Sequence, residues 1–185
     1  LTNPDEYPMA RGSIGSTSGL SLQAHEFDIY FEEEHVAHTT ALQAKIKNKG
    51  SYVTGPISRY NLNRHMLSPL VQEVIKDIRF EETCTNPFRS IIVRALEVLY
   101  ACDEAIRLID AYDGEKRPPS VPIEKRACTG YGATEAPRGL LFHRYRLNDK
   151  GIIEDARMVP PTSQNQKTIE KDLFDFVKDH ISLPA

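Results

Sequence analysis

Two short segments carry side chains that could together hold a small anion. In Glu135–Gly139 an arginine, Arg138, stands between a proline and a glycine. In Val159–Asn165 two prolines precede a pair of hydroxyls, Thr162 and Ser163. A guanidinium offers up to five planar N–H donors and each hydroxyl offers one more, so the two segments would form a donor-rich cradle where they meet. Proline–arginine turns are also common at ordinary surfaces, and residue type alone leaves both interpretations open.

Three other groups have spacings that could serve a cofactor. Gly130–Glu135 looks superficially like a dinucleotide-binding loop, but it lacks the third glycine and the strand-then-helix setting, so we expect its glycines to allow a tight turn or a close approach. His35 and His38 follow three glutamates, and we expect surface histidines at a solvated strand end because no carboxylate or thiolate is in register with them. The cysteines form no Cys-x-x-Cys pair and are expected to be reduced thiols. They are Cys84, Cys102 and Cys128.

A predicted β-hairpin lies between the two cradle segments. Residues 140–147 alternate between the two faces of a strand, Asn148–Gly151 has the composition of a turn, and residues 152–159 form the returning strand. Because a hairpin brings the outer ends of its strands together, Arg138 and Thr162 are expected at one end of it. The hairpin is therefore the element that would assemble the cradle.

Helical patterns occur before and after this hairpin. Ser68–Pro69 is a typical helix start, and a second start at Asn86–Pro87 opens an apolar stripe that runs to about Tyr112. Cys102 falls in that stripe and is expected in the core, whereas Glu97 falls on the polar side. Proline and glycine predict a loop over residues 113–125. A last helix is expected from about residue 165 to residue 180. Its buried stripe is expected to contain Ile169, Leu173, Phe176 and Val177.

The order of these elements predicts an α+β fold with a helical core. Residues 1–58 look β-rich, and within them Phe27–Phe31 alternates as a half-buried strand does. Residues 59–112 are expected to be helical, residues 126–165 to hold the hairpin with its active-site loops, and residues 165–181 to form the last helix. No alternating βαβ units are visible.

Composition narrows the classes of function only broadly. The 185 residues are 40% hydrophobic and 26% charged, with a formal net charge of −3. That balance is ordinary for a globular protein and provides no basic face for nucleic acid or polybasic membrane anchor. No apolar stretch approaches the ~20 residues that a membrane span requires. A cytoplasmic protein is expected.

Several segments resemble the large subunits of nickel–iron hydrogenases. Glu135–His143 is similar to the Ala-Pro-Arg-Gly segment of that family, and Pro160–Asn165 is similar to the Pro-Thr/Ser…Asn segment that follows it. Gly55–Asn63 and Glu33–Thr40 resemble the soluble cytoplasmic branch, whose members couple hydrogen to nicotinamide or a deazaflavin. The similarity runs in order over nearly the whole chain, and several motifs in one order are more specific than any of them alone.

The resemblance implies a role for the cradle. In the family, four cysteines hold a nickel and an iron, and the iron carries carbon monoxide and two cyanides, which are anionic acceptors. Carried over to this chain, Arg138 would donate to one cyanide, face the nickel and help polarise hydrogen by preorganised charge. Thr162 would donate to the other cyanide, with Ser163 as the alternative donor. Pro137 and Pro161 would form walls of the pocket.

The cysteines are where the chain departs from the family. The family has a Cys-x-x-Cys pair near each terminus, and this chain has neither. The resemblance therefore predicts that residues 1–185 are a C-terminal-half piece of a larger large-subunit domain, inactive and without nickel or iron when alone. The complete protein would hold the Ni–Fe centre with its two cyanides and one carbon monoxide.

The resemblance also implies partners. They are H2, diaphorase-type electron-transfer subunits and an iron–sulfur small subunit. Two other hypotheses remain: a metal-free hydrogenase-like scaffold subunit of a respiratory-type complex, and an unrelated α+β binding domain. The presence of both Arg138 and Thr162 favours the enzyme, because metal-free relatives generally lose the cyanide-binding residues.

Overall fold

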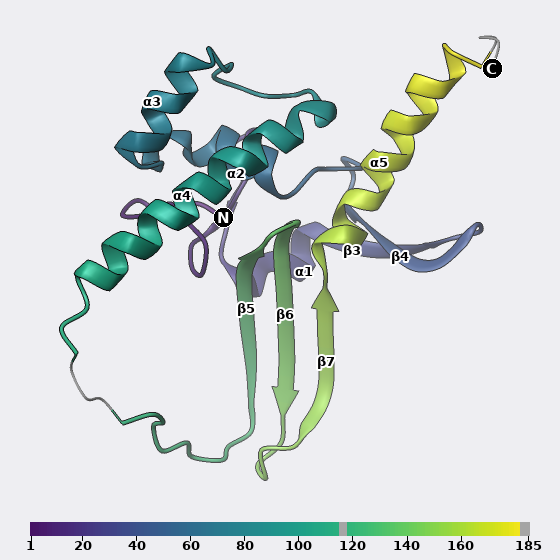
Figure 1. The fold of residues 1–185 in the computed structure, drawn as a ribbon. Helices are drawn as coiled ribbons and strands as arrows, with labels where there is room; N and C mark the ends of the chain where they lie inside the picture. The colour runs from purple at the N-terminus through teal and green to yellow at the C-terminus, as the bar shows by residue number, and fades with distance from the viewer. Residues whose placement is uncertain (115–117, 182–185) are drawn as a thin grey trace.

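The structure of the protein, a computed structural model, describes residues 1–114 and 118–181. Short strands come first, a group of helices follows, and a three-stranded sheet and a last helix complete the chain (Figure 1). This arrangement confirms the predicted α+β fold. Residues 115–117 of the predicted loop 113–125 lie outside the described residues.

The N-terminal part forms two small antiparallel pairs of strands. They are β1 (Ile14–Gly15) with β2 (Ser21–Leu22), and β3 (Phe31–Val36) with β4 (Thr39–Ile46). The expected strand at Phe27–Phe31 is wrong, because α1 (Phe27–Tyr30) is helical and follows a 3-10 turn at Ala24–Glu26. A capping box between Gln23 and Glu26 starts that turn, and local capping outweighs the alternation of the next few side chains.

Two helix starts in the helical part were predicted correctly, those at Ser68 and Asn86. The helices are α2 (Pro56–Asn63), α3 (Pro69–Asp77) and α4 (Ser90–Asp110), with 3-10 turns at Arg64–Met66 and Pro87–Arg89. Ser68 is the N-cap of α3 and Asn86 is the N-cap of the turn before α4, where its side chain accepts a hydrogen bond from Phe88 N. Proline at the first position suits both starts, since the first N–H groups of a helix have no partner within it.

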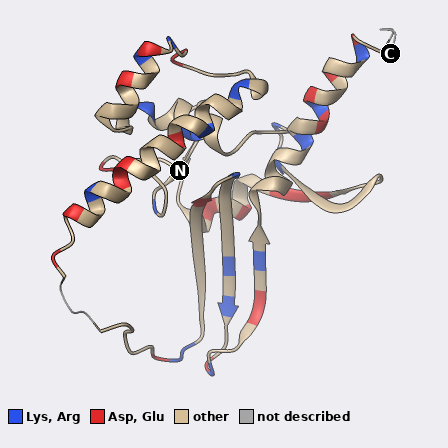
Figure 2. Cartoon of the chain, in the orientation of Figure 1, with Lys and Arg blue, Asp and Glu red and all other residues tan. Residues whose placement is uncertain are grey.

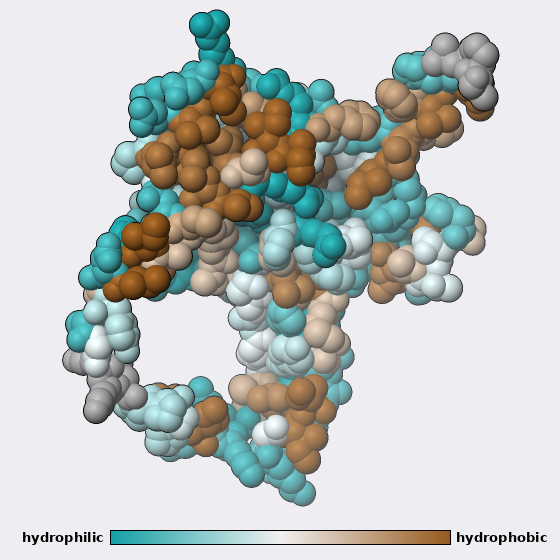
Figure 3. All heavy atoms as spheres, viewed as in Figure 1, coloured by the Kyte–Doolittle hydropathy of each residue, from teal (hydrophilic) through white to brown (hydrophobic). Residues whose placement is uncertain are grey.

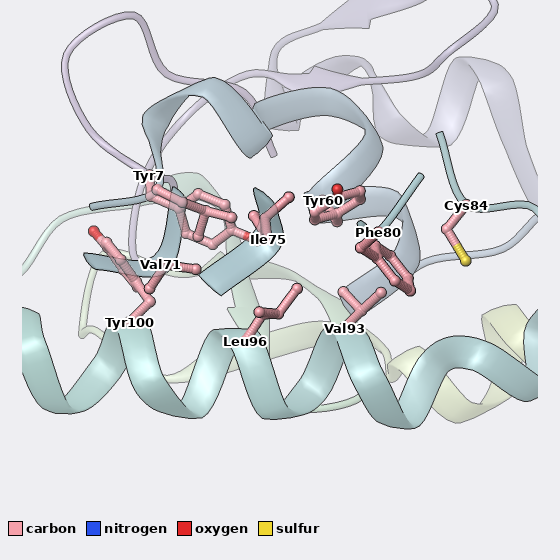
Figure 4. Close-up of a cluster of buried hydrophobic side chains, with 10 residues drawn as sticks. Tyr7, Tyr60, Val71, Ile75, Phe80, Cys84, Val93, Leu96 and Tyr100 are labelled. Carbon is pink, nitrogen blue, oxygen red and sulfur yellow. The ribbon is translucent and has the colours of Figure 1, made fainter. Parts of the chain in front are cut away.

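These helices enclose the first of two hydrophobic cores (Figure 4). Its buried residues are Tyr7, Tyr60, Leu67, Val71, Ile75, Phe80, Cys84, Val93, Leu96 and Tyr100. The buried face of α4 differs from the predicted stripe, because Glu97 is buried and Cys102 is exposed. The helix is apolar on more than one side, so its periodicity could not say which side meets α2 and α3.

The sheet consists of β5 (Cys128–Ala136), β6 (Gly139–Leu147) and β7 (Ile153–Val159) in that order, all antiparallel. The predicted hairpin is confirmed as β6 and β7, with the turn at Asn148–Gly151. Strand β5 was not predicted. Gly130 and Gly132 lie within this strand, so the tight turn expected there is wrong, and no other atom of the described chain lies within 4 Å of a Cβ at either position.

The two ends of this sheet have different surroundings (Figure 1). We call the end with Ala136, Gly139 and Val159 the anchored end, because it joins the rest of the molecule. The other end, with Leu147 and Ile153, is the open end and projects away from the helices. The second core lies beside the anchored end. Its buried residues are Leu1, Ile14, Leu22, Phe27, Phe31, Ala44, Leu140, Phe142 and Val159.

Charged residues are frequent on the half of β6 and β7 that leads to the open end (Figure 2). Arg144 pairs with Asp155 at 2.8 Å, and Arg146 lies 3.9 Å from Glu154 across the two strands. The first pair is half-buried, whereas the second is exposed to solvent and stabilises the sheet only weakly.

The last helix, α5 (Pro161–Lys178), starts four residues before its predicted start. Its predicted buried stripe is wrong, since Ile169, Leu173, Phe176 and Val177 are all exposed. The helix instead meets β4 through polar side chains, such as the hydrogen bond from Gln43 Nε2 to Glu170 Oε1 at 2.8 Å. Figure 3 shows the resulting apolar surface along α5 and α4. Within the described ranges, no helix combines the length and apolar character that crossing a bilayer requires.

Candidate functional site

The Pro137–Arg138 segment is a two-residue turn that joins β5 to β6 at the anchored end. Ala136 and Gly139 face each other in the register, and Pro137 and Arg138 form the exposed tip between them. Gly139 has φ +137°, a value that side chains rarely allow. The candidate arginine therefore lies in a hairpin turn and not merely ahead of a strand.

The backbone of this turn is held from one side by the segment before α2. Thr54 Oγ1 accepts a hydrogen bond from Leu140 N at 2.8 Å. Gly55 and Gly139 pass so closely that a Cβ on Gly55 would lie 2.5 Å from the carbonyl oxygen of Arg138. Gly55 has φ +114° and ψ −154°, a conformation that is almost exclusive to glycine. The resembling motif at residues 55–63 thus serves as the support of the arginine turn.

Asn165 in α5 completes that support. Its Nδ2 donates to Arg138 O at 3.2 Å, and its Oδ1 accepts from Thr54 N at 2.8 Å. One amide therefore links the turn, the segment before α2 and the first turns of α5.

Arg59 holds the same turn from the interior. All five N–H groups of its guanidinium have an acceptor. The Nε donates to Glu97 Oε1 at 2.6 Å and one Nη2 bond reaches Glu97 Oε2 at 2.6 Å. The Nη1 donates to Glu135 Oε2 at 2.9 Å and to Ala136 O at 2.9 Å, and the second Nη2 bond reaches Pro137 O at 3.4 Å. One cation thus binds the carboxylates of Glu97 and Glu135 together with two backbone carbonyls at the β5–β6 turn.

This cluster is buried. The side chains of Arg59, Glu97 and Glu135 are 3%, 10% and 2% exposed. Tyr7 donates to Glu97 Oε1 at 2.7 Å. Burial would lower the pKa of Arg59, but the hydrogen bonds and charges of Glu97 and Glu135 outweigh it and raise that pKa. The pKa of Tyr7 is raised, first by its burial and then by the charge of Glu97.

The start of α5 is fixed by a buried glutamine. Gln164 Nε2 donates to Leu140 O at 2.6 Å and to Val159 O at 3.0 Å, and Gln164 Oε1 accepts from Tyr52 Oη at 3.1 Å. The side chain thereby joins the ends of β6 and β7. Thr162 and Ser163 lie in the first turn of α5, next to this junction.

The structure brings the two predicted cradle segments to the same end of the sheet. Pro137, Arg138 and Thr162 are exposed, and Pro161 is buried. Ser163 Oγ donates to Pro160 O at 2.9 Å, so its proton is engaged within the helix start. Across residues 1–114 and 118–181, no hydrogen bond or ion pair involves the Arg138 guanidinium or the Thr162 hydroxyl. Both donors are therefore available to a ligand, although neither touches the other.

Sequence reasoning missed the residues that hold the turn. Arg59 and Glu135 stood inside resembling motifs without an assigned role, and Glu97 was placed on the polar side of its helix. The available signal was chemical: a lone glutamate among the apolar residues at 91–99 requires a partner when buried. That signal identifies a need for a cation but does not say which arginine meets it.

Thiolates that could ligate a metal are not gathered at this site. Cys84 is buried in the first core, where burial raises the pKa of its thiol. Cys102 is exposed on α4, and Cys128 is exposed at the start of β5, at the sheet end opposite Arg138. The described part of the chain contains no group of three or more His, Cys, Asp or Glu side chains that could hold a metal ion. The free donors at the anchored end are a guanidinium and a hydroxyl, which are groups that an anionic acceptor can use.

The relatives found by comparison with known proteins are hydrogenase subunits. No protein-family model matches the chain. The vhu F420-non-reducing hydrogenase of Methanococcus voltae has a subunit that is 33% identical over 160 residues, which are 82% of this chain and 38% of that protein. The alpha chain of sulfhydrogenase 1 from Pyrococcus furiosus is 27% identical over 177 residues, or 95% of this chain and 41% of that protein. The chain thus spans less than half the length of these relatives.

A solved structure agrees with these relatives at the level of the fold. The NAD+-reducing nickel–iron hydrogenase in its H2-reduced state superposes with a TM-score of 0.72 at 20% identity, over 90% of this chain and 40% of that chain. At such an identity the likeness establishes the fold alone. The sequence comparison and the fold comparison both match this chain to part of a hydrogenase subunit.

Proposed function

The chain belongs to the nickel–iron hydrogenase large subunits, matching a part of one, and we propose that this part supplies hydrogen-bond donors to the anionic ligands of the metal centre. The reaction of the complete protein would be reversible oxidation of H2 coupled to a soluble electron carrier. Residues 1–185 form one piece of the larger domain in this proposal, and their own task is positioning and charge.

One observation carries the proposal: a fixed backbone presents a free guanidinium. The turn that bears Arg138 is bonded to α2, to α5 and to the segment before α2, while the guanidinium itself has no partner in the described residues. An unpaired cation on a rigid turn is the arrangement that preorganised electrostatic stabilisation requires.

The remaining residues of the cradle have distinct tasks in this proposal. Thr162 donates its free hydroxyl to a second anionic acceptor, and Ser163 would have to release Pro160 O to take that role. Pro137 and Pro161 limit the motion of the two segments and exclude water from the ligand. When bound in the complete protein, a nickel–iron centre supplies heterolytic cleavage of H2 and electron transfer. Arg138 would hold positive charge beside it without changing protonation.

The partners of the complete protein are also proposed. An iron–sulfur small subunit would receive the electrons, and diaphorase-type subunits would pass them to a soluble acceptor in the cytoplasm. The names of the relatives differ in this respect: one structural neighbour is named as NAD+-reducing, and the relative from Methanococcus voltae is named as not reducing F420.

Replacement of Arg138 tests the proposal in the full-length protein. Lysine keeps the charge but loses the planar fork, so Arg138→Lys should lower hydrogen turnover by ~10²–10³, the typical cost of one preorganised donor. Nickel content should not change, because Arg138 is not a metal ligand. The measurement is hydrogen-dependent dye reduction normalised to nickel.

Arg146→Lys is the matched control, since Arg146 lies on the next strand toward the open end and is exposed. It should leave turnover unchanged. Turnover of Arg138→Lys within a factor of about two of the parent, against the expected loss of ~10²–10³, would remove Arg138 from the site and contradict the proposal.

A further inference from the structure

We propose that Arg59, Glu97 and Glu135 are positioning residues that hold the turn bearing Arg138 and so fix the direction in which the Arg138 side chain leaves the backbone. The inference rests on the proposed function, because it gives the buried cluster a role toward the same site. It goes further in assigning that role to side chains that lie beneath the turn and not at its surface.

The geometry of the two peptide planes beside Arg138 is the first argument. A peptide unit is planar, so the direction of a Cα–Cβ bond is fixed once both neighbouring planes are fixed. Arg59 Nη2 donates to Pro137 O at 3.4 Å and holds the plane before Arg138. Asn165 Nδ2 donates to Arg138 O at 3.2 Å and holds the plane after it. The Arg138 side chain therefore leaves the turn in one direction.

The number of donors is the second argument. Arg59 uses all five N–H groups, and two of them go to the carbonyls of Ala136 and Pro137. The other three go to Glu97 and Glu135, which are buried and fix the plane of the guanidinium itself. Lysine has three donors and no plane, so it cannot satisfy the carboxylates and the turn together.

The origin of the three residues is the third argument. Arg59 lies on α2, Glu97 on α4 and Glu135 on β5. Residues of α2 and α4 belong to the first core, whereas β5 belongs to the sheet beside the second core. The cluster thus fixes the position of the turn relative to both cores. Its hydrogen bonds are stronger in a low-dielectric setting, so the turn is held rigidly.

The test compares Arg59→Lys with Arg64→Lys in the full-length protein. Arg64 follows α2 directly and pairs with Glu82 at 2.8 Å in a more exposed setting, so it is a control of the same chemistry. Hydrogen–deuterium exchange of the peptide that covers residues 134–142 is the main measurement, because it needs no metal. We expect exchange in Arg59→Lys to be roughly tenfold faster there while other core peptides keep their protection, and no change in Arg64→Lys.

Two measurements on the metal-loaded protein accompany it. The infrared stretching bands of metal-bound cyanide should shift in Arg59→Lys, because they respond to hydrogen bonds from the protein. Turnover per nickel should fall by about 10²-fold, the cost of a small misplacement of a catalytic group. A structural role alone would lower thermal stability while leaving the cyanide bands of the folded protein unshifted, and that result would overturn the inference.

A second variant keeps the inference testable if Arg59→Lys does not fold. Glu97→Gln keeps the volume of a buried member of the cluster but removes its charge and one acceptor from Arg59, and it should loosen the same peptide and shift the same bands. Unchanged exchange at residues 134–142 in whichever variant folds would also overturn the inference. If Arg138→Lys lowers turnover but these variants have no effect, the positioning role alone is wrong. If they loosen the turn while Arg138→Lys keeps full turnover, the proposed function is wrong.

Discussion

The anchored end and the open end of the β5–β7 sheet hold their turns by different means. At the anchored end, side chains from α2, α5 and the segment before α2 bond the backbone of residues 136–140. At the open end, the turn at Asn148–Gly151 is closed by its own first residue, whose Oδ1 accepts from Lys150 N and Ile152 N at 3.0 Å each.

The difference shows how far a turn can be held by its own residues and how far it depends on distant parts of the chain. The open turn contains all the groups that close it, and solvent could replace its bonds at little cost. The anchored turn depends on partners that arrive only when the chain folds, and its bonds to Arg59 and Thr54 are partly buried. Equivalent substitutions at the two ends should therefore have unequal effects.

The largest contrast should come from one glycine at each end. Gly139→Ala places a Cβ 2.7 Å from Gly55 N and from Thr54 Cγ2, at a φ of +137°, so backbone must move. We expect it to lower the free energy of unfolding by about 3 kcal/mol or more, from strain and overpacking together. Gly151→Ala has φ +75° and no atom closer than 3.5 Å, and strain alone should cost about 1 kcal/mol. Urea denaturation of both proteins measures the difference in the free energy of unfolding. Equal losses would show that the two ends of the sheet tolerate a Cβ equally well.

A smaller contrast should separate a buried amide from an exposed one. Gln164→Leu leaves the carbonyls of Leu140 and Val159 without their side-chain donor, and should destabilise the protein by about 2 kcal/mol. Asn148→Ala removes two solvent-exposed bonds and should cost about 0.5–1 kcal/mol. Thermal denaturation of the two variants ranks them. The reverse order would mean that the open turn is the stronger support.

The smallest effect should come from a half-buried carboxylate on α5. Hydrogen bonds from Gln43, then His38 and Gln166, lower the pKa of Glu170 to about 2. A lowered carboxyl pKa stabilises the folded state above the unfolded value, and this contribution is lost as the pH falls from about 4.5 toward about 2. NMR titration of the Glu170 carboxyl measures the pKa, and Gln43→Ala should raise it. A midpoint near the ordinary value in the parent protein would show that α5 is not held to β4 in this way.

Local patterns predicted a substantial part of this fold. The β6–β7 hairpin, its turn and the helix starts at Ser68 and Asn86 all follow from neighbours in the sequence, because capping and turn formation involve residues a few positions apart. The same hairpin placed the Arg138 and Thr162 segments at one end. Motif similarity identified the nickel–iron hydrogenase relatives, since an ordered series of short segments survives in chains of low identity.

Patterns failed where a second element decides the outcome. Strand β5 contains two glycines and little alternation, and it exists because β6 offers a full ladder of partners. The apolar stripe of α5 is real, yet in the described chain its polar side meets β4, since periodicity shows which side of a helix is apolar but not what covers it.

Residue types alone settle that Arg138 carries a permanent planar cation next to a proline, and that glycines at 55 and 139 allow backbones to approach closely. The tertiary structure alone decides that Arg59, Glu97 and Glu135 come together beneath that turn. Their pairing depends on α2, α4 and β5, which meet only when the two cores form, and a buried charge is stable only beside the partners that folding brings to it.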